Sequence, residues 1–289
     1  KVRAEGDADA CVRFVTHSMG GLVLRSALGL RGRSPFQDVG RIVFIAPPFQ
    51  GSCDIPKVLV AGERGGWLSS EEDFRKLARS FPAVYELIPS FRRAAVDSAT
   101  GAEVDLFDYR NWQRNVVQQT GTERDKLQPG LLADAEAFRR GRRAQHGGAS
   151  AAPLLTDGQL RRHADQIAIL LSVGDETPYR IPVVAGNTQN PNWFDFDNQL
   201  TDDHGDLRVH LKSAAVRGIT LAAYRGIKSH ALVCRENIVI KSAAAWLQGN
   251  RLLKMRPRRP RHTVGRSGRD YFDPWNGRTG SLKDHIVDV

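Results

Sequence analysis

A serine at the apex of a short turn, between a strand-like run and a helix-like run, constrains this fold more than any other feature. The turn Thr16–Gly21 follows the apolar stretch 11–15 and precedes a helical pattern over residues 21–28. Strand, tight turn and helix in this order form a nucleophile elbow, which lifts the apical hydroxyl clear of a parallel sheet. The pattern therefore predicts that Ser18 is a nucleophile.

The residues around the serine fit this interpretation. Positions two before and two after the nucleophile pack closely and must be small. Gly20 meets that demand, and Thr16 replaces the first glycine of the usual G-x-S-x-G pattern. Because Met19 opens the helix, its N–H is expected to point at the oxyanion of an attacked ester.

A serine hydroxyl needs a base, and a third group must orient that base. With this elbow the acid and then the histidine follow the nucleophile along the chain. His230 lies between the apolar stretch 219–224 and the helical pattern 237–247. This loop position predicts that His230 is the base, with His210 and His204 as alternatives.

The acid is sought before that loop. Asp206 lies in the segment 205–214, after a strand-like run at 180–186 and a long polar loop. It is predicted to accept the Nδ1 proton of His230 and to stabilise the imidazolium. Asp203 and Asp202 are the alternatives.

The motifs in this order resemble the lecithin:cholesterol acyltransferase-like group of α/β-hydrolases. Two further stretches, 44–52 and 81–89, continue the resemblance. The first reads Pro47-Pro48 where that group often has proline–histidine, and the acid loop has Leu207 where glycine is usual. The resemblance implies a mostly parallel sheet with helices on both faces.

The same resemblance sets the expected domain boundaries. Residues 1–249 are expected to form the hydrolase domain, with a helical cap inserted at about 57–175. Because so few residues precede Ser18, we expect an N-terminally truncated fold whose early strands are missing. One oxyanion donor normally comes from an early loop, and losing it costs on the order of 10²–10³ in rate.

Composition narrows the class of protein. An apolar content of 41% is enough for a sizeable core, and no run approaches the roughly 18 apolar residues of a membrane span. Cys11, Cys53 and Cys234 lack metal-ligand spacing. They favour a reducing compartment, so a cytoplasmic location is expected unless a missing N-terminus carried a signal peptide.

The formal net charge of +10 is concentrated near the C-terminus. Residues 250–289 hold ten Lys/Arg and four Asp, a balance of +6. The run 255–261 contains two prolines and no hydrophobic period, so residues 250–289 are predicted to be a disordered basic tail. Weak contact with anionic membranes is expected, but no specific nucleic-acid recognition, because no groove-reading fold accompanies the charge.

The sequence thus predicts a serine-dependent carboxylic ester hydrolase (lipase or esterase) or O-acyltransferase that works through an acyl-enzyme without metal or organic cofactor. Aromatic residues of the cap region suit a lipid-like ester. Two alternatives stay open. One is a non-catalytic hydrolase-like scaffold within a larger protein, and the other is a membrane-surface or nucleic-acid binder that acts through the tail.

Overall fold

The computed structural model describes most of the chain: residues 11–32, 34–63, 70–117, 126–140, 154–186, 192–227 and 229–253, with short strands at 271–272, 279–280 and 286–288. The chain divides into two compact units. The first contains residues 1–49, 155–176 and 203–289, and the second contains residues 50–154 and 177–202. The strands at residues 175–185 and 200–205 each contain residues that are assigned to both units.

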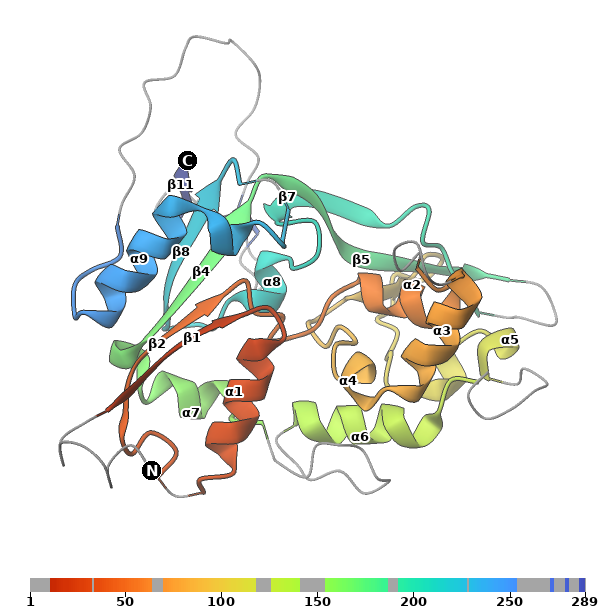
Figure 1. The fold of residues 1–289 in the computed structure, drawn as a ribbon. Coiled ribbons are helices and arrows are strands. Elements are labelled where there is room, and N and C mark those ends of the chain that lie inside the picture. Colours follow the sequence, from red (N-terminus) through yellow and green to blue (C-terminus); the bar gives the residue numbers. More distant parts are fainter. Residues whose placement is uncertain are drawn as a thin grey trace, which may run out of the picture. The chain divides into compact units, whose positions relative to one another are not determined.

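The first unit is built on a parallel sheet of five strands (Figure 1). Their order across the sheet is β1 (Val12–His17), β2 (Val39–Ile45), β4 (Ile167–Val173), β8 (Thr220–Arg225) and β11 (Ile286–Asp288). Every neighbouring pair is parallel. The predicted α/β class with a mostly parallel sheet is therefore confirmed.

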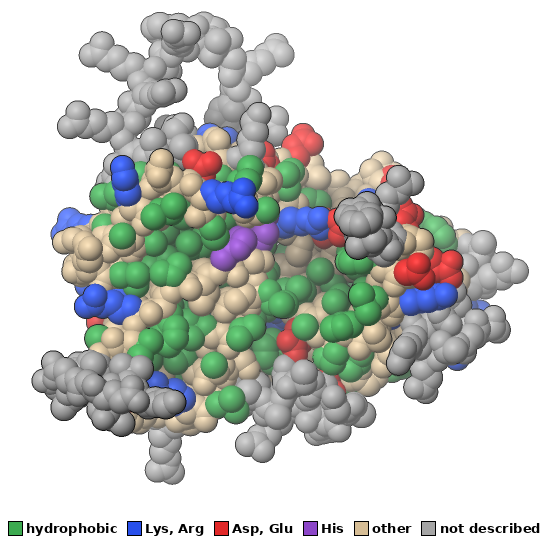
Figure 2. All heavy atoms as spheres, viewed as in Figure 1, with side chains coloured by type: hydrophobic (Ala, Val, Ile, Leu, Met, Phe, Trp, Pro, Cys, Tyr) green, Lys and Arg blue, Asp and Glu red, His purple; other side chains and the backbone are tan. Residues whose placement is uncertain are grey.

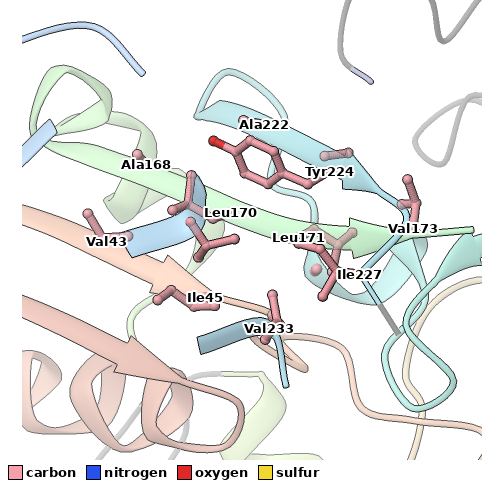
Figure 3. Close-up of a cluster of buried hydrophobic side chains, with 14 of the residues drawn as sticks. Val43, Ile45, Ala168, Leu170, Leu171, Val173, Ala222, Tyr224, Ile227 and Val233 are labelled. Atoms are coloured by element: carbon pink, nitrogen blue, oxygen red, sulfur yellow. The ribbon is translucent and has the colours of Figure 1, made fainter. Parts of the chain in front are cut away.

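Every residue of β4 is buried, so this strand forms the centre of the first unit. Its side chains join those of β2 and β8 in one apolar cluster, in which Ile45, Leu170 and Val233 lie close together (Figure 3). A strand covered on both faces reads as a continuous apolar run rather than an alternating one. Residues 167–173 fall within the range 57–175 that the sequence assigned to the cap, yet they belong to the main sheet.

Helices of the first unit cover this sheet. Helix α1 (Gly20–Gly29) packs against β1, and α9 (Asn237–Leu247) packs against β2 and β4. Tyr224 of β8 donates a hydrogen bond of 2.7 Å to Ser242 of α9, which satisfies both buried hydroxyls. The shorter helical elements of the unit are α7 (Asp157–Arg161), η4 (Ala164–Gln166), α8 (Leu211–Ala214) and η5 (Val233–Arg235).

The second unit combines helices with a small sheet. Its strands are β3 (Ala95–Asp97), β5 (Asp175–Ala185) and β6 (Asn192–Phe194), and β7 (Leu200–Gly205) also pairs with β5. Its helical elements are α2 (Asp54–Val60), α3 (Glu71–Ser80), α4 (Pro82–Tyr85), η2 (Tyr109–Asn111), α5 (Arg114–Val117) and α6 (Pro129–Arg139). The predicted strand-like run 180–186 falls in β5 of this smaller sheet, where it pairs with β3 and β6 rather than with the parallel sheet of the first unit.

Three short strands fall within residues 250–289, where the sequence predicts disorder. Strands β9 (Tyr271–Phe272) and β10 (Thr279–Gly280) form an antiparallel pair, and β11 joins the main sheet beside β8. The proline-containing basic run 255–261 lies outside the described residues. Within the part of the chain that the structure describes, no helix has the length and apolar character needed to cross a bilayer.

Candidate active site

Ser18 lies at the junction of β1 and α1 in a left-handed backbone conformation, with φ of 53°. Such a conformation is costly for a residue with a Cβ, and its surroundings must hold it in place. The Ser18 amide donates to the carbonyl of Ile45 (2.9 Å), and the Ser18 carbonyl accepts from the amide of Gly21 (3.0 Å). The turn is thus tied to the end of β2 and to the first turn of the helix.

Neighbouring side chains pack more closely against Gly21 than against Gly20. A Cβ at Gly20 would lie 3.7 Å from the Cβ of Thr16, an ordinary contact. At Gly21 the Cβ would lie 3.0 Å from Pro47 and 3.3 Å from the rings of Phe44 and Phe49. The close packing of the elbow therefore requires glycine at position 21, whereas a Cβ at position 20 could lie beside Thr16.

His230 comes from the loop between β8 and η5 and reaches both predicted partners. Its Nε2 lies 2.7 Å from the Oγ of Ser18, and its Nδ1 lies 2.8 Å from Oδ2 of Asp206. A carboxylate can only accept, so Nδ1 carries the proton of the neutral ring. Nε2 is then the acceptor for the hydroxyl proton of Ser18.

Asp206 is completely buried, and its second oxygen is held by the backbone. Oδ1 accepts from the amides of Val209 (2.8 Å) and Arg208 (3.2 Å). Leu207 has φ of 77°. A glycine would adopt this conformation without strain. Leu207 therefore occupies a left-handed position at which the lecithin:cholesterol acyltransferase-like group usually has glycine.

The alternative residues have different partners. Asp203 forms an ion pair with Arg225 at 2.9 Å, and its carbonyl accepts from Gly174. His210 accepts the amide of Lys212 at its Nδ1, 3.0 Å away. The structure therefore brings Ser18, His230 and Asp206 into one hydrogen-bonded chain, with Asp206 rather than Asp203 beside the imidazole.

Met19, the predicted oxyanion donor, is the N-cap residue of α1. The first amides of a helix have no acceptor within that helix and lie at the positive end of its dipole. The Met19 amide is therefore in the first set of N–H groups that an anion next to Ser18 would meet.

One group of side chains in the described residues has the composition of a metal site. The donor atoms of Asp202, His204 and His210 lie within 4.8 Å of one another. However, Nδ1 of His210 accepts the Lys212 amide, so the neutral ring carries its proton on Nε2. Neither nitrogen then offers a lone pair to a metal, and we assign none to this group.

Comparison with known proteins relates part of the chain to one family. A sequence model of the lecithin:cholesterol acyltransferase family matches residues 4–136. Over these residues the chain is similar to lecithin:cholesterol acyltransferases. The matched segment contains Ser18 but ends before Asp206 and His230, so the placement of those two residues comes from the structure alone.

A structural comparison supports the fold independently. A chain in the crystal structure of the Tle4–Tli4 complex superposes with a TM-score of 0.52 at 15% identity, covering 86% of the present chain. The present chain spans 60% of the length of that chain. No curated protein matches the sequence. At this identity the likeness concerns the fold alone.

Two polar residues that hold the base loop were not singled out from the sequence. Ser172 donates its hydroxyl to the carbonyl of Ile227 (2.9 Å), and Asp175 accepts the amide of Ser229 (3.2 Å). Ser172 could have been noticed, because a serine within the apolar run 167–173 must find a partner when buried. No comparable pattern marks Asp175.

Proposed function

We propose that the protein is a serine-dependent carboxylic ester hydrolase or O-acyltransferase that acts on lipid-like esters through an acyl-enzyme. The observation that carries this proposal is the hydrogen-bonded chain from Ser18 through His230 to Asp206, with distances of 2.7 and 2.8 Å. These three side chains supply the nucleophile, the base and the group that orients the base.

The proposed reaction follows from the proton positions. Ser18 Oγ attacks the ester carbonyl while its proton passes to Nε2 of His230. Asp206 stabilises the imidazolium, and the Met19 N–H binds the oxyanion. As the tetrahedral intermediate collapses, the C–O bond to the leaving alcohol breaks, and that alcohol takes the proton from His230. A water or a second alcohol then attacks the acyl-enzyme by the same steps.

Burial of Asp206 makes this arrangement effective. The carboxylate is 0% exposed, and two backbone amides fix Oδ1. Because Oδ1 is held, Oδ2 faces His230 in one orientation. Because this carboxylate is buried, its charge stabilises the imidazolium more strongly than an exposed carboxylate would.

The preference for an apolar substrate is supported by exposed apolar residues that lie within two positions of the three residues in the sequence. Met19 follows Ser18 and is 41% exposed, and Leu207 follows Asp206 and is 44% exposed. Leu232 lies two residues after His230 and is 39% exposed. Figure 2 shows histidine side chains at the surface with hydrophobic side chains nearby. Exposed apolar side chains next to polar catalytic groups suit an acyl chain.

Hydrolysis of p-nitrophenyl esters of increasing acyl length tests this function. We expect turnover by the wild type that favours longer chains, and loss of turnover in Ser18→Ala by a factor of at least about 10⁴. Adding a long-chain alcohol distinguishes acyl transfer from hydrolysis through the product formed. A folded wild type that hydrolyses none of the esters would contradict the proposal and favour a non-catalytic scaffold.

A further inference from the structure

His17 precedes the nucleophile and contacts the base that activates it. It is the last residue of β1, where it pairs with Ile45 of β2, and its side chain is partly buried. Its Nε2 lies 3.1 Å from the main-chain oxygen of His230. A carbonyl oxygen can only accept, so His17 carries a proton on Nε2 and donates it to this bond.

The two imidazole rings also face each other. Their centroids are 4.8 Å apart, and their planes are inclined by 32°. Burial, followed by the charge of protonated His230, lowers the pKa of His17, while its hydrogen bond to the His230 backbone and the charge of Asp206 act in the opposite direction. His17 is therefore neutral at neutral pH and can lie against the His230 imidazolium without placing a second positive charge there.

The loop that carries His230 needs such support. It contains Gly226 and Ser229 with φ of 91° and 72°, and the second of these is strained for a residue with a Cβ. Ser172 and Asp175 hold the loop at Ile227 and Ser229. The bond from His17 holds the backbone of His230 itself, and it does so from the residue adjacent to Ser18.

We infer that His17 is a positioning residue, which uses its Nε2–H to fix the main chain of His230 at hydrogen-bonding distance from Ser18. This inference rests on the proposed function. The strand end that carries the nucleophile thereby also sets the place of the base. A small displacement of a catalytic group can lower the rate by about a hundredfold, so this link controls proton transfer.

Two substitutions at His17 distinguish the contribution of its N–H donor from that of its ring. His17→Phe keeps a ring against His230 but removes the N–H, whereas the amide nitrogen of His17→Gln stands close to the place of Nε2. We expect His17→Phe to lower kcat on a p-nitrophenyl ester about ten- to hundredfold with little change in KM. His17→Gln is expected to retain kcat within a few-fold.

His163→Phe provides the matched control, because His163 also lies against an aromatic ring, that of Phe36, with centroids 3.9 Å apart. Its kcat is expected to equal that of the wild type. A wild-type kcat in His17→Phe would overturn the inference, and so would an equal loss in both His17 variants. If His17→Phe does not fold, a tenfold loss in folded His17→Gln overturns the inference, and retention of kcat supports it.

Fluorophosphonate labelling keeps this inference separate from the proposed function. If the folded wild type gives no adduct at Ser18, the proposed function has failed. If the wild type is labelled and His17→Phe is labelled equally fast, the proposed function stands and the positioning role is wrong. Slower labelling of His17→Phe, with recovery in His17→Gln, supports both.

Discussion

The Nε2 of His230 lies 2.7 Å from the Oγ of Ser18, although 212 residues separate them in the sequence. Each residue sits beside a strand end of the same parallel sheet, Ser18 after β1 and His230 after β8. Loops that follow the carboxyl ends of parallel strands meet at one edge of the sheet, where α/β proteins place their sites. The sheet topology thus brings the two side chains together.

Replacing Asp206 with asparagine tests the orienting group. The amide offers His230 a donor or a neutral acceptor in place of a carboxylate, so the ring loses both its fixed tautomer and its counter-charge. We expect kcat to fall on the order of 10³–10⁴. Asp203→Asn is the matched control, because Asp203 pairs with Arg225, and its activity should stay near that of the wild type. A larger loss in Asp203→Asn than in Asp206→Asn would reverse the assignment of the acid.

Backbone strain at Ser18 should be measurable as a difference in the free energy of unfolding between two variants. With φ of 53°, Ser18 has a conformation that costs about 1–3 kcal/mol for a residue with a Cβ. Glycine avoids that cost but adds about 0.4–1 kcal/mol of entropy to the unfolded chain. We expect the free energy of unfolding of Ser18→Gly to exceed that of Ser18→Ala by about 1 kcal/mol in urea titrations. A less stable glycine variant would show that the elbow is unstrained.

Close packing at Gly21 predicts a difference between neighbouring glycines. A methyl group there would meet Pro47 at 3.0 Å, whereas at Gly20 the nearest atom, in Thr16, is 3.7 Å away. Gly21→Ala should therefore destabilise the fold by about 1–3 kcal/mol. Gly20→Ala should be tolerated, since alanine favours the helix. Urea midpoints of the two variants provide the comparison, and equal midpoints would contradict this account of the elbow.

The lowered pKa of His17 predicts a pH dependence of stability. The pKa in the folded chain lies below the ordinary value of 6.5, so below that pH the unfolded chain binds the proton more readily. The stability contributed by neutral His17 is complete above 6.5 and is lost as the pH falls towards the folded pKa. His17→Gln cannot titrate, so its Tm should fall less steeply than that of the wild type between about pH 8 and about pH 5. Parallel curves would contradict the prediction.

The elements around Ser18 and His230 could be predicted because their signals are local. A strand-like run, a small-residue turn and two helical patterns predicted the boundaries of β1, α1 and α9 to within a residue or two. Strand β4 was missed because a nearly continuous apolar run has no period that distinguishes a buried strand from a helix. The run 180–186 reads as a strand, but its sequence does not say which sheet it joins.

The contacts within the candidate site were harder to predict from the sequence. The order of the motifs suggested Asp206 and His230, but the choice between Asp206 and Asp203 depends on a loop in which Leu207 adopts a left-handed conformation. The hydrogen bond from His17 to the backbone of His230 forms where the end of β1 meets a loop that is distant in sequence. No residue pattern predicts it. Propensity and spacing describe segments, whereas these contacts arise from tertiary packing.

Fluorophosphonate labelling followed by peptide mapping tests the central claim most directly, with His230→Gln as the comparison. The account predicts a single adduct on Ser18 in the folded wild type and labelling slowed by at least about 10³-fold in His230→Gln, because the base is missing. A folded wild type without an adduct at Ser18, or equal labelling rates in the two proteins, would contradict it.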